Sequence, residues 1–395
     1  MKNSRNKIYA VDIIMSFIVV FGVVMFLPML PHLQEYFAVS VTQISWLPNI
    51  GYLTMIVFSI IVGKLINKVG IKNLILISLS LWILGIVIEL IALGSISFYT
   101  FVMGRFIEGV GEAFIFPILL SMNKAELKVA KEEKIGLSLI EFSAALGGLI
   151  AAMISGKLLN NPGKFLVIPI SIAVITMVFI IFKFNKTRLF EEQKEVVNEK
   201  AKESMKAYIS LLIMIFMVQA IFVSIQVYLA YYLEVFNASS LTGVIISIEE
   251  VMIGLGTLAP IFIFKNMSFK RIRNIIVVAL GLGSVILALQ ISIYIAIATS
   301  AVIAFFVGAG FTALNFYVLK TIKTKVTQKL SLYSTIRISG GFVLSIVWGN
   351  LIESYKSSGL SYREIFKYLY LFEGIYIVLI FIIIVYMQKR EVSFE

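Results

Sequence analysis

The feature that most constrains this chain is a series of apolar runs, each about as long as a bilayer is thick. A bilayer core needs about 20 apolar residues for each spanning helix. Runs bounded by charged residues, Gly, Pro and Asn predict twelve spans, and only Ser292 and Tyr294 mark the turn between the ninth and the tenth. The runs cover residues 8–28, 44–63, 73–93, 98–120, 135–156, 165–182, 207–232, 241–263, 274–292, 294–318, 331–352 and 367–387. The predicted fold class is therefore an all-α integral membrane protein with twelve transmembrane helices.

The composition excludes a soluble protein. Apolar residues (AVILMFWYC) make up 60% of the chain, charged residues make up 14%, and the mean hydropathy is +0.99. A soluble domain is closer to half apolar and a quarter charged. The first run is longer than the apolar part of a signal peptide and lacks a small-residue cleavage site, so we expect it to be retained as the first helix. The absence of Cys excludes disulfides, thiolate metal sites and cysteine nucleophiles.

The net charge of +12 is unevenly divided between the two sides of the predicted membrane. Of the 34 Lys and Arg residues, 27 fall in loops on the side of the N-terminus, five fall on the other side and two lie inside runs. Loops rich in Lys and Arg stay in the cytoplasm, which places both termini there. The charge thus orients the chain and predicts no nucleic-acid partner. The expected location is the plasma membrane of a bacterium, and the protein is expected to be monomeric.

The longest polar stretch divides the runs into six and six. It reads "KFNKTRLFEEQKEVVNEKAKESMK" and covers residues 183–206. Its charges predict a solvated cytoplasmic linker with some amphipathic helix. We therefore expect an N-terminal six-helix bundle over residues 1–182 and a C-terminal six-helix bundle over residues 207–395.

The two halves also repeat in sequence. With a shift of 193 residues, Gly147 and Gly148 of the fifth run fall on Gly340 and Gly341 of the eleventh. Small residues of this kind let helices approach closely and slide, so these glycines are candidate gating residues, and plain packing is the alternative. Parallel six-helix repeats around a midplane cavity are a transporter architecture. A weaker match pairs the fourth run with the tenth: Gly109-Val110-Gly111 with Gly308-Ala309-Gly310.

Four short motifs carry a resemblance to a known family. They are "MFLPMLPHLQEYF" (25–37), "GKLINKVGIKN" (63–73), "RFIEGVGEA" (105–113) and "SAALGG" (143–148). Together they resemble the major facilitator superfamily over essentially the whole chain. The third motif is similar to Arg-x-x-Gln-Gly-x-Gly-x-Ala of drug–proton antiporters, in which the arginine is associated with proton coupling. The resemblance implies two pseudo-symmetric six-helix bundles that expose a central cavity to each side in turn.

The loop motif implies a gate. Gly63, Lys68 and Gly70 fit the family pattern Gly-x-Leu-x-Asp-Arg-x-Gly-Arg-Lys, in which the aspartate is thought to latch the gate. Asn67 replaces that aspartate here, which implies a weaker or differently built latch. In "SAALGG" the Gly-Gly of the exporters is kept, but their Gly-Pro is a Ser-Ala pair at 143–144. This departure leaves uptake open as an alternative to export.

Ten ionisable residues lie inside the predicted spans. A charge at mid-bilayer costs a few kcal/mol on insertion scales, so such residues are functional candidates. Asp12 is about one turn inside the cytoplasmic end of its run, and Glu89 is close enough to the outer end to snorkel. The ten are Asp12, Glu89, Arg105, Glu108, Glu112, Glu141, Glu249, Glu250, Arg337 and Glu373.

Arg105, Glu108 and Glu112 are predicted to couple transport to protons. Their spacing of i, i+3 and i+7 places them on one helical face. A guanidinium stays charged and holds one carboxylate as a bidentate partner. The second carboxylate is less compensated and takes up a proton more readily. The sequence leaves open which glutamate carries the proton, and the alternative is a purely structural Arg–Glu pair.

A second set of residues is predicted to bind substrate. Glu249 and Glu250 point about 100° apart, so at most one faces a central cavity, and Arg337 is a candidate partner for the other. Gln219 and Gln226 are seven residues apart and share a face. The candidate substrate-binding residues are Glu141, Glu249, Glu250, Gln219, Gln226, Asn315, Arg337 and Glu373.

The leading predicted function is proton-coupled export of a small amphipathic cation or zwitterion. The substrate is either a drug-like cation, as in multidrug efflux, or a secreted metal-chelating metabolite rich in amines and carboxylates. The alternative is an uptake symporter or facilitator. The sole histidine, His32, falls in a predicted external loop, and neither HExxH nor a P-loop is present. We therefore expect no enzyme activity, no cofactor and no metal site.

Overall fold

The computed structural model describes residues 2–126, 130–158, 162–184 and 204–389, and in these ranges all regular secondary structure is helical. The first half contains α1 (Lys2–Val24), η1 (Leu27–Met29), α2 (Leu30–Phe37), α3 (Val41–Val69), α4 (Ile71–Ser95), α5 (Phe98–Ala113), α6 (Ile115–Glu126), α7 (Ala130–Leu158) and α8 (Pro162–Phe184). The second half contains α9 (Met205–Leu233), η3 (Glu234–Phe236), η4 (Ser239–Leu241), α10 (Thr242–Phe262), α11 (Phe269–Leu289), α12 (Ile293–Thr321), α13 (Val326–Ser357) and α14 (Tyr362–Lys389).

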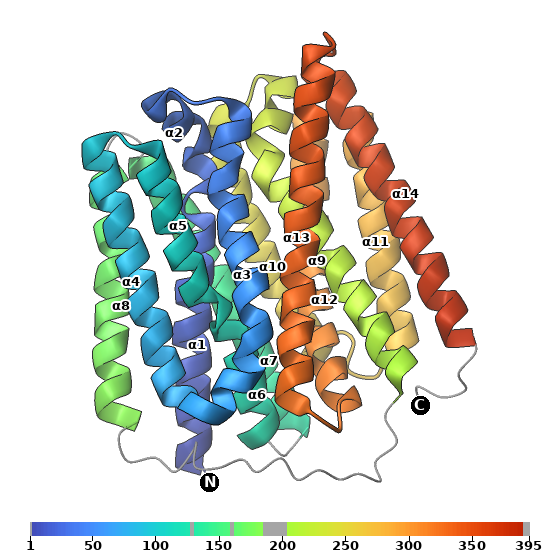
Figure 1. Ribbon diagram of the computed structural model, residues 1–395. Coiled ribbons are helices and arrows are strands. Elements are labelled where there is room, and N and C mark those ends of the chain that lie inside the picture. Colours follow the sequence, from blue (N-terminus) through green and yellow to red (C-terminus); the bar gives the residue numbers. More distant parts are fainter. Residues whose placement is uncertain (1, 127–129, 159–161, 185–203, 390–395) are drawn as a thin grey trace.

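The long helices stand side by side in one bundle (Figure 1). The start of α1 and the end of α14 lie at the same end of this bundle, which is named the termini face below. The opposite end is named the far face. Most of the predicted linker, residues 185–203, lies outside the described residues.

The predicted all-α membrane fold is confirmed. Eleven helices in the described ranges are long and apolar enough to cross a membrane, judged by length and composition. The helix α8 occupies the place of the sixth predicted run, and the apolar part assigned to it is Leu166–Val178. The region 274–318 forms two helices, α11 and α12, as the sequence predicts. The fourth run is divided into α5 and α6 at Phe114.

Short polar signals set the helix ends. Ser40, Ser97, Ser204 and Ser292 precede α3, α5, α9 and α12, and each side chain accepts a hydrogen bond from a backbone N–H of the first turn. A cap of this type stabilises a helix by about 0.5–2 kcal/mol. Gly70 has a φ of 81°, and it is the single residue between α3 and α4. A glycine at this position allows the sharp reversal with no longer loop.

The outward surface of the bundle is apolar. Phe262 is 73% exposed, Ile175 is 68% exposed and Ile91 is 60% exposed, whereas Trp82 and Trp348 are buried. Soluble monomers rarely expose contiguous apolar patches of more than a few hundred Å². These helices are apolar toward the outside as well as toward the core, as expected for helices surrounded by lipid.

The internal repeat is visible in how the helices cross. A Cβ built on Gly147 of α7 would lie 3.1 Å from the Cα of Phe17 in α1. A Cβ built on Gly340 of α13 would lie 3.1 Å from the Cα of Phe216 in α9. The aligned glycines therefore make the same close backbone crossing, one in each half of the chain.

A second pair of crossings repeats in the same way. A Cβ on Gly109 of α5 would lie 3.0 Å from the Cα of Gly51 in α3, and one on Gly308 of α12 would lie 3.0 Å from the Cα of Ile253 in α10. Only glycine allows two helix backbones to approach this closely without displacement. The weaker of the two sequence matches thus also corresponds to equivalent packing.

Gly340→Ala is expected to destabilise the protein by about 1–3 kcal/mol, because the new methyl group would overlap the backbone of Phe216. Gly94 in α4 provides a matched control, since a Cβ built there meets nothing within 4 Å. Gly94→Ala is expected to be neutral or slightly stabilising, because Ala favours helix over Gly. The measurement is the thermal unfolding midpoint of the purified variants in detergent. Equal midpoints for the two variants would contradict the close crossing.

The two halves meet along two helix pairs, α3 with α13 and α7 with α10. Near the termini face the first pair is in tight contact, because a Cβ on Gly63 would lie 2.9 Å from the Cα of Gln328. Ser59 and Thr335 share a hydrogen bond of 2.7 Å between their hydroxyls. On α6, the Lys124 ammonium donates to the carbonyl of Leu319 on α12 at 2.6 Å. These contacts close the termini face.

Candidate functional site

A buried ionic cluster lies between α3, α4 and α5. The Arg105 guanidinium pairs with the Glu108 carboxylate one turn along α5, and both side chains are buried. Its Nε donates to the carbonyl of Leu47 at 3.4 Å. The guanidinium carbon also lies 4.7 Å from the ring centroid of Phe26, a cation–π distance. Arg105 is therefore held from three directions.

Glu108 and Glu112 both point toward α1. A Cβ built on Gly22 would lie 2.7 Å from Oε1 of Glu108 and 2.9 Å from Oε1 of Glu112. The indole Nε1 of Trp82 donates to Oε1 of Glu112 at 3.4 Å. Gly22 thus leaves the space in which the two carboxyl groups meet the first helix. The sequence placed the two glutamates on one face but did not identify this glycine opposite them.

Glu89 belongs to the same cluster. The sequence left open that Glu89 snorkels to the membrane surface, but its side chain is completely buried. Its Cγ would lie 2.6 Å from a Cβ on Gly104, so α4 and α5 approach closely at this point. Neither carboxyl oxygen of Glu89 has a hydrogen-bond partner among the described residues. Glu89 therefore adds a third carboxyl group to the neighbourhood of a single guanidinium.

The charges of this cluster do not balance when every group is ionised. Glu89, Glu108 and Glu112 would contribute three negative charges against the one positive charge of Arg105, all inside the bundle. An uncompensated buried charge costs several kcal/mol. Protons on the surplus carboxyl groups remove that cost. The cluster therefore combines one fixed cation with more buried carboxyl groups than that cation can compensate.

A second ion pair lies at the centre of the molecule and joins the two halves. Nη1 of Arg337 on α13 is 2.5 Å from Oε1 of Glu141 on α7, and Nη2 is 2.9 Å from Oε2. The expected pairing of Arg337 with a glutamate of α10 is thus wrong. The bidentate geometry is the strongest arrangement available to a guanidinium and a carboxylate.

Asp12 belongs to neither ion pair. It is fully buried near the termini face and accepts a hydrogen bond of 2.9 Å from Asn123.

Polar side chains extend the central pair. Nδ2 of Asn315 donates to Oε1 of Glu141 at 2.8 Å, and the hydroxyl of Tyr333 donates to Oδ1 of Asn315 at 3.0 Å. Nε of Arg337 donates to Oε1 of Gln219 at 3.2 Å. The predicted residues Gln219, Asn315 and Arg337 are therefore brought together with Glu141. Tyr333 was not identified from the sequence, although it follows the repeated Leu-Ser-Leu.

Glu250 contributes a second carboxyl group to this region. Its Oε1 accepts a hydrogen bond of 3.0 Å from Nε2 of Gln226 on α9. A Cβ on Gly148 of α7 would lie 2.6 Å from the Cδ of Glu250, so the carboxyl group lies against that helix. The glycine leaves space for an acidic side chain from the other half of the chain.

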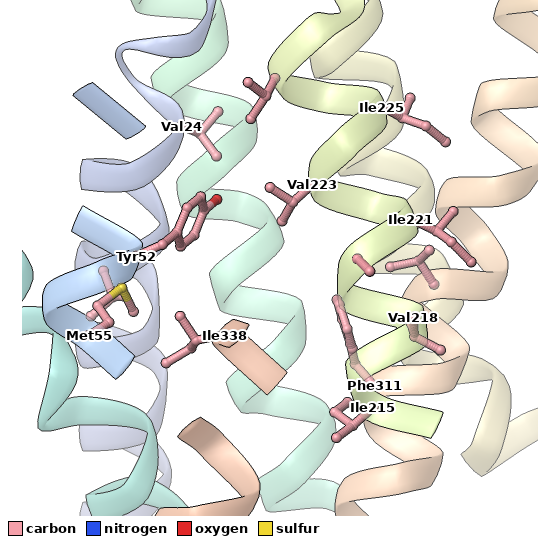
Figure 2. Packing of buried hydrophobic residues seen from close by; sticks show 14 of the residues in the cluster. Val24, Tyr52, Met55, Ile215, Val218, Ile221, Val223, Ile225, Phe311 and Ile338 are labelled. Atoms are coloured by element: carbon pink, nitrogen blue, oxygen red, sulfur yellow. The ribbon is translucent and has the colours of Figure 1, made fainter. Parts of the chain in front are cut away.

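The central groups surround a cavity of about 80 Å³. Apolar and aromatic side chains complete its wall, and Figure 2 shows Val24, Tyr52, Met55 and Ile338 among them. Phe311 lies under the Arg337 guanidinium, with 3.9 Å between the guanidinium carbon and the ring centroid. Binding pockets for drug-sized ligands measure about 300–1,000 Å³. The centre is thus nearly closed, and a larger molecule requires the two halves to separate.

Two predicted substrate-binding residues lie away from this cavity. Glu373 of α14 accepts hydrogen bonds from Ser224 at 3.1 Å and from Ser284 at 3.4 Å, inside the second half. Glu249 is also buried, and it lies close to Ser300 of α12 and Gln226 of α9. As predicted from their 100° separation, only one of the two neighbouring glutamates of α10 lines the cavity.

The predicted gating residues lie in two places. Gly63, Asn67, Lys68 and Gly70 lie at the termini end of α3 and at the joint that follows it. Gly147, Gly148, Gly340 and Gly341 lie at mid-helix in α7 and α13. Within the described ranges, no three His, Asp or Glu side chains are grouped so that they could hold a metal ion.

The sequence was compared with known proteins. Residues 13–345 match the family model described as Major Facilitator Superfamily. Over 191 residues the chain is 27% identical to the uncharacterized MFS-type transporter YhcA of Bacillus subtilis (strain 168). That match covers 46% of this chain and 35% of YhcA, so it spans about a third of the relative's length.

Solved structures share the fold at low sequence identity. The proton:xylose symporter XylE matches with a TM-score of 0.76 at 14% identity, covering 98% of this chain and 96% of XylE. The transporter FucP in an outward conformation gives 0.74 at 13% identity, covering 99% and 100%. A bacterial homologue of the iron transporter ferroportin in an outward-facing state gives 0.75 at 13% identity, covering 98% and 100%.

Proposed function

Since the chain belongs to the Major Facilitator Superfamily, whose members are transporters rather than enzymes, we propose that it is a proton-coupled secondary active exporter. The cargo is a small amphipathic molecule that carries a positive charge. With both termini in the cytoplasm of a bacterium, as the Lys and Arg distribution predicts, the far face is the external face. The bundles 1–182 and 207–395 are the two units that rock against each other, and the protein works as a monomer.

One observation carries the proposal of proton coupling. Three buried carboxyl groups, Glu89, Glu108 and Glu112, surround a single guanidinium. A buried surplus of negative charge requires protons or another cation to compensate it. Glu108 already pairs with Arg105, so Glu112 and Glu89 are the groups best placed to load and release the proton.

The substrate class follows from the wall of the central cavity. Arg337 compensates the charge of Glu141, so Glu250 supplies the negative charge that no cationic side chain of this wall pairs with. Phe311, Phe116 and Tyr52 supply aromatic faces. Cations are attracted both to carboxylates and to aromatic rings. Arg337 is the one cationic side chain among the described residues of this wall, and it suits the carboxylate of a zwitterion. A lipophilic drug-like cation is the first candidate, and an amine–carboxylate metal chelator is the second.

The gate is proposed to lie at the termini face. Gly63 packs against Gln328 there, and Lys124 bonds to the α12 backbone. Loading from that side requires these contacts to break. The glycines at 147, 148, 340 and 341 would then act as fixed crossings about which each unit turns, with Asn67 and Lys68 next to the contact that opens.

Uptake is the second candidate function. The Ser-Ala pair at 143–144 replaces the Gly-Pro of exporters, and the Ser143 hydroxyl lies 2.7 Å from that of Ser16 on α1. One protein of the same fold, XylE, is a proton symporter. The direction of counterflow in proteoliposomes of known orientation separates the two candidates.

Glu112→Gln is expected to abolish proton exchange while leaving the protein folded, because Glu112 is not the partner of Arg105 in the ion pair. Proteoliposomes with an acidic interior would contain a pH-sensitive dye, and candidates would be added outside. Lipophilic cations and amine–carboxylate chelators form the panel. We expect one class to dissipate the pH gradient with the wild-type protein and not with Glu112→Gln, because the neutral amide cannot take part in proton exchange.

Glu353→Gln is the matched control, because Glu353 is exposed on α13 and outside both ionic clusters. Proteoliposomes with Glu353→Gln should lose their pH gradient when the substrate is added, as those with the wild-type protein do. Unchanged pH dependence in Glu89→Gln, Glu108→Gln and Glu112→Gln alike would reduce the α5 cluster to a structural ion pair and end the proton-coupling proposal.

A further inference from the structure

A second, much larger hollow lies next to the central cavity on the side of the far face. Its volume is about 990 Å³, and it is named the far groove below. The two hollows follow one another along the same helices. Val24, at the end of α1, lines the cavity, and Pro28, four residues later, lines the far groove. On α7, Ala145 lines the cavity and Leu149 lines the far groove. On α9, Gln226 lines the cavity and Ala230 lines the far groove. A molecule leaving the centre therefore passes one helical turn into the far groove.

The far groove has a polar end with negative charge. Glu35 at the end of α2 and Glu234 in η3 line it, and both are exposed. No Lys or Arg is among the described residues of its wall. His32 and Tyr231 are the other ionisable residues that line it. A site lined by carboxylates and by no fixed cation attracts a positively charged group.

Tyr231 contributes an aromatic ring to the wall of the far groove, and its hydroxyl lies behind that wall with almost no accessible surface. Its side chain lines the far groove and is 8% exposed. Its buried hydroxyl has no hydrogen-bond partner among the described residues, although buried polar atoms are nearly always partnered. Its ring lies 6.3 Å from that of Tyr228 and 6.2 Å from that of Tyr362, measured between centroids. Aromatic faces of this kind bind alkylammonium groups.

The other side of the far groove is apolar and continuous with the membrane-facing surface. Val244, Ile248 and Val251 of α10 line it and are 58%, 36% and 44% exposed. Their spacing of four and three residues places them in one stripe, which Leu255 extends toward the membrane interior at 49% exposure. Met153 of α7 lies on the same wall and is 51% exposed. The far groove thus opens sideways toward lipid as well as toward the far face.

We propose that the far groove is an exit-side binding site for an amphipathic monocation. Its charged head lies between Glu35, Glu234 and the Tyr231 ring, and its apolar part lies along the stripe 244–251 of α10. The proposal rests on the exporter function above and selects the lipophilic cation over the amine–carboxylate chelator, because the described wall of the far groove has no Lys or Arg to hold a carboxylate. Such a molecule leaves from the far groove into the outer half of the bilayer as well as into water.

The absence of native Cys allows a test that does not depend on transport. Ser240 lines the far groove and is exposed, so Ser240→Cys introduces a single thiol there. Labelling by a water-soluble maleimide is followed in lipid nanodiscs, where both faces are accessible. Tetraphenylphosphonium is expected to slow labelling, and tetramethylammonium at the same concentration is not, because it lacks the apolar body.

Removing the charges should weaken the protection. In a Glu35→Gln/Glu234→Gln background the tetraphenylphosphonium concentration for half protection is expected to rise about fivefold, as for the loss of two exposed charge contacts. Tyr231→Phe, which removes only the buried hydroxyl, should leave protection unchanged, whereas Tyr231→Leu, which removes the aromatic face, should weaken it. Glu353→Gln should leave protection unchanged. Ser358→Cys, exposed on the same face and outside the far groove, should label equally with and without the cation.

The possible failures are distinguishable. Protection that is unaffected by Glu35→Gln/Glu234→Gln, or equal protection by tetramethylammonium, overturns the proposed site. Slow labelling in nanodiscs without any cation, but fast labelling in detergent, identifies a bilayer lipid as the occupant and also overturns it. Gradient dissipation by tetraphenylphosphonium without any protection leaves the exporter proposal intact and ends this one. Protection of Ser240→Cys by tetraphenylphosphonium without any gradient dissipation supports the site in the far groove and contradicts the exporter proposal.

Discussion

Arg105→Met is expected to lower the stability of the protein by about 3–5 kcal/mol at neutral pH, the cost of leaving a buried charge without its partner. Glu108, Glu89 and Glu112 would then lie in the bundle without any guanidinium to compensate them. The loss should be smaller at pH 5 than at pH 8, because protonated carboxyl groups carry no charge to be compensated. The measurement is the thermal unfolding midpoint in detergent at the two pH values.

Two further variants make this result specific. Arg105→Met combined with Glu108→Gln should recover part of the lost stability, because the pair is removed as a unit, but should not recover transport. Arg363→Met, at an exposed arginine, should leave the midpoint unchanged at both pH values. If Arg105→Met unfolds at the wild-type temperature at pH 8, the cluster is already neutral without Arg105.

Glu141→Gln is expected to reduce transport at least about thirtyfold, the equivalent of about 2 kcal/mol for losing one member of a desolvated charge pair. The Glu141–Arg337 pair joins α7 of the first half to α13 of the second. Without it Arg337 keeps its contacts with Gln219 and Phe311 but has no carboxylate. The two halves would lose their central ionic link.

A structural readout distinguishes that link from a simple loss of substrate binding. Spin labels at Lys68→Cys and Lys323→Cys, both exposed at the termini face, report the separation of the halves. In Glu141→Gln the distance distribution between the labels should broaden toward longer values, whereas Glu353→Gln should leave it unchanged. An unchanged distribution together with lost transport would make Glu141 a substrate ligand with no part in holding the halves.

Features that depend on one helix at a time could be predicted from the sequence. The runs predicted the spans because a lipid environment requires an apolar segment of fixed length. The spacing of Arg105 and Glu108 placed them on one face, and the structure pairs them. The repeated glycines of α7 and α13 make equivalent crossings, because in each half the missing side chain lets two helix backbones approach closely.

Features that depend on which helices are neighbours could not be predicted in the same way. Arg337 pairs with Glu141, a residue 196 positions away, and nothing in either helix alone specifies that partner. Glu89 lies near the end of its apolar run, yet the crossing of α4 and α5 at Gly104 buries it. Tyr52 and Phe311 line the cavity, but aromatic residues are common along the whole chain, so their type gave no signal.

The paired glycine crossings have a consequence for the energy of the transport cycle. Equivalent crossings at 147 and 340, and at 109 and 308, give the two halves nearly the same internal framework. Because the two halves are parallel repeats, exchanging them turns an arrangement open at one face into another that is open at the same face. Each half can therefore turn about its own crossings as one unit, and the internal strain of that turn is similar in the two halves. The two halves differ at the Arg105 cluster, for which the aligned tenth span carries no ionised counterpart, so at this crossing an ion gradient can act on the first half alone.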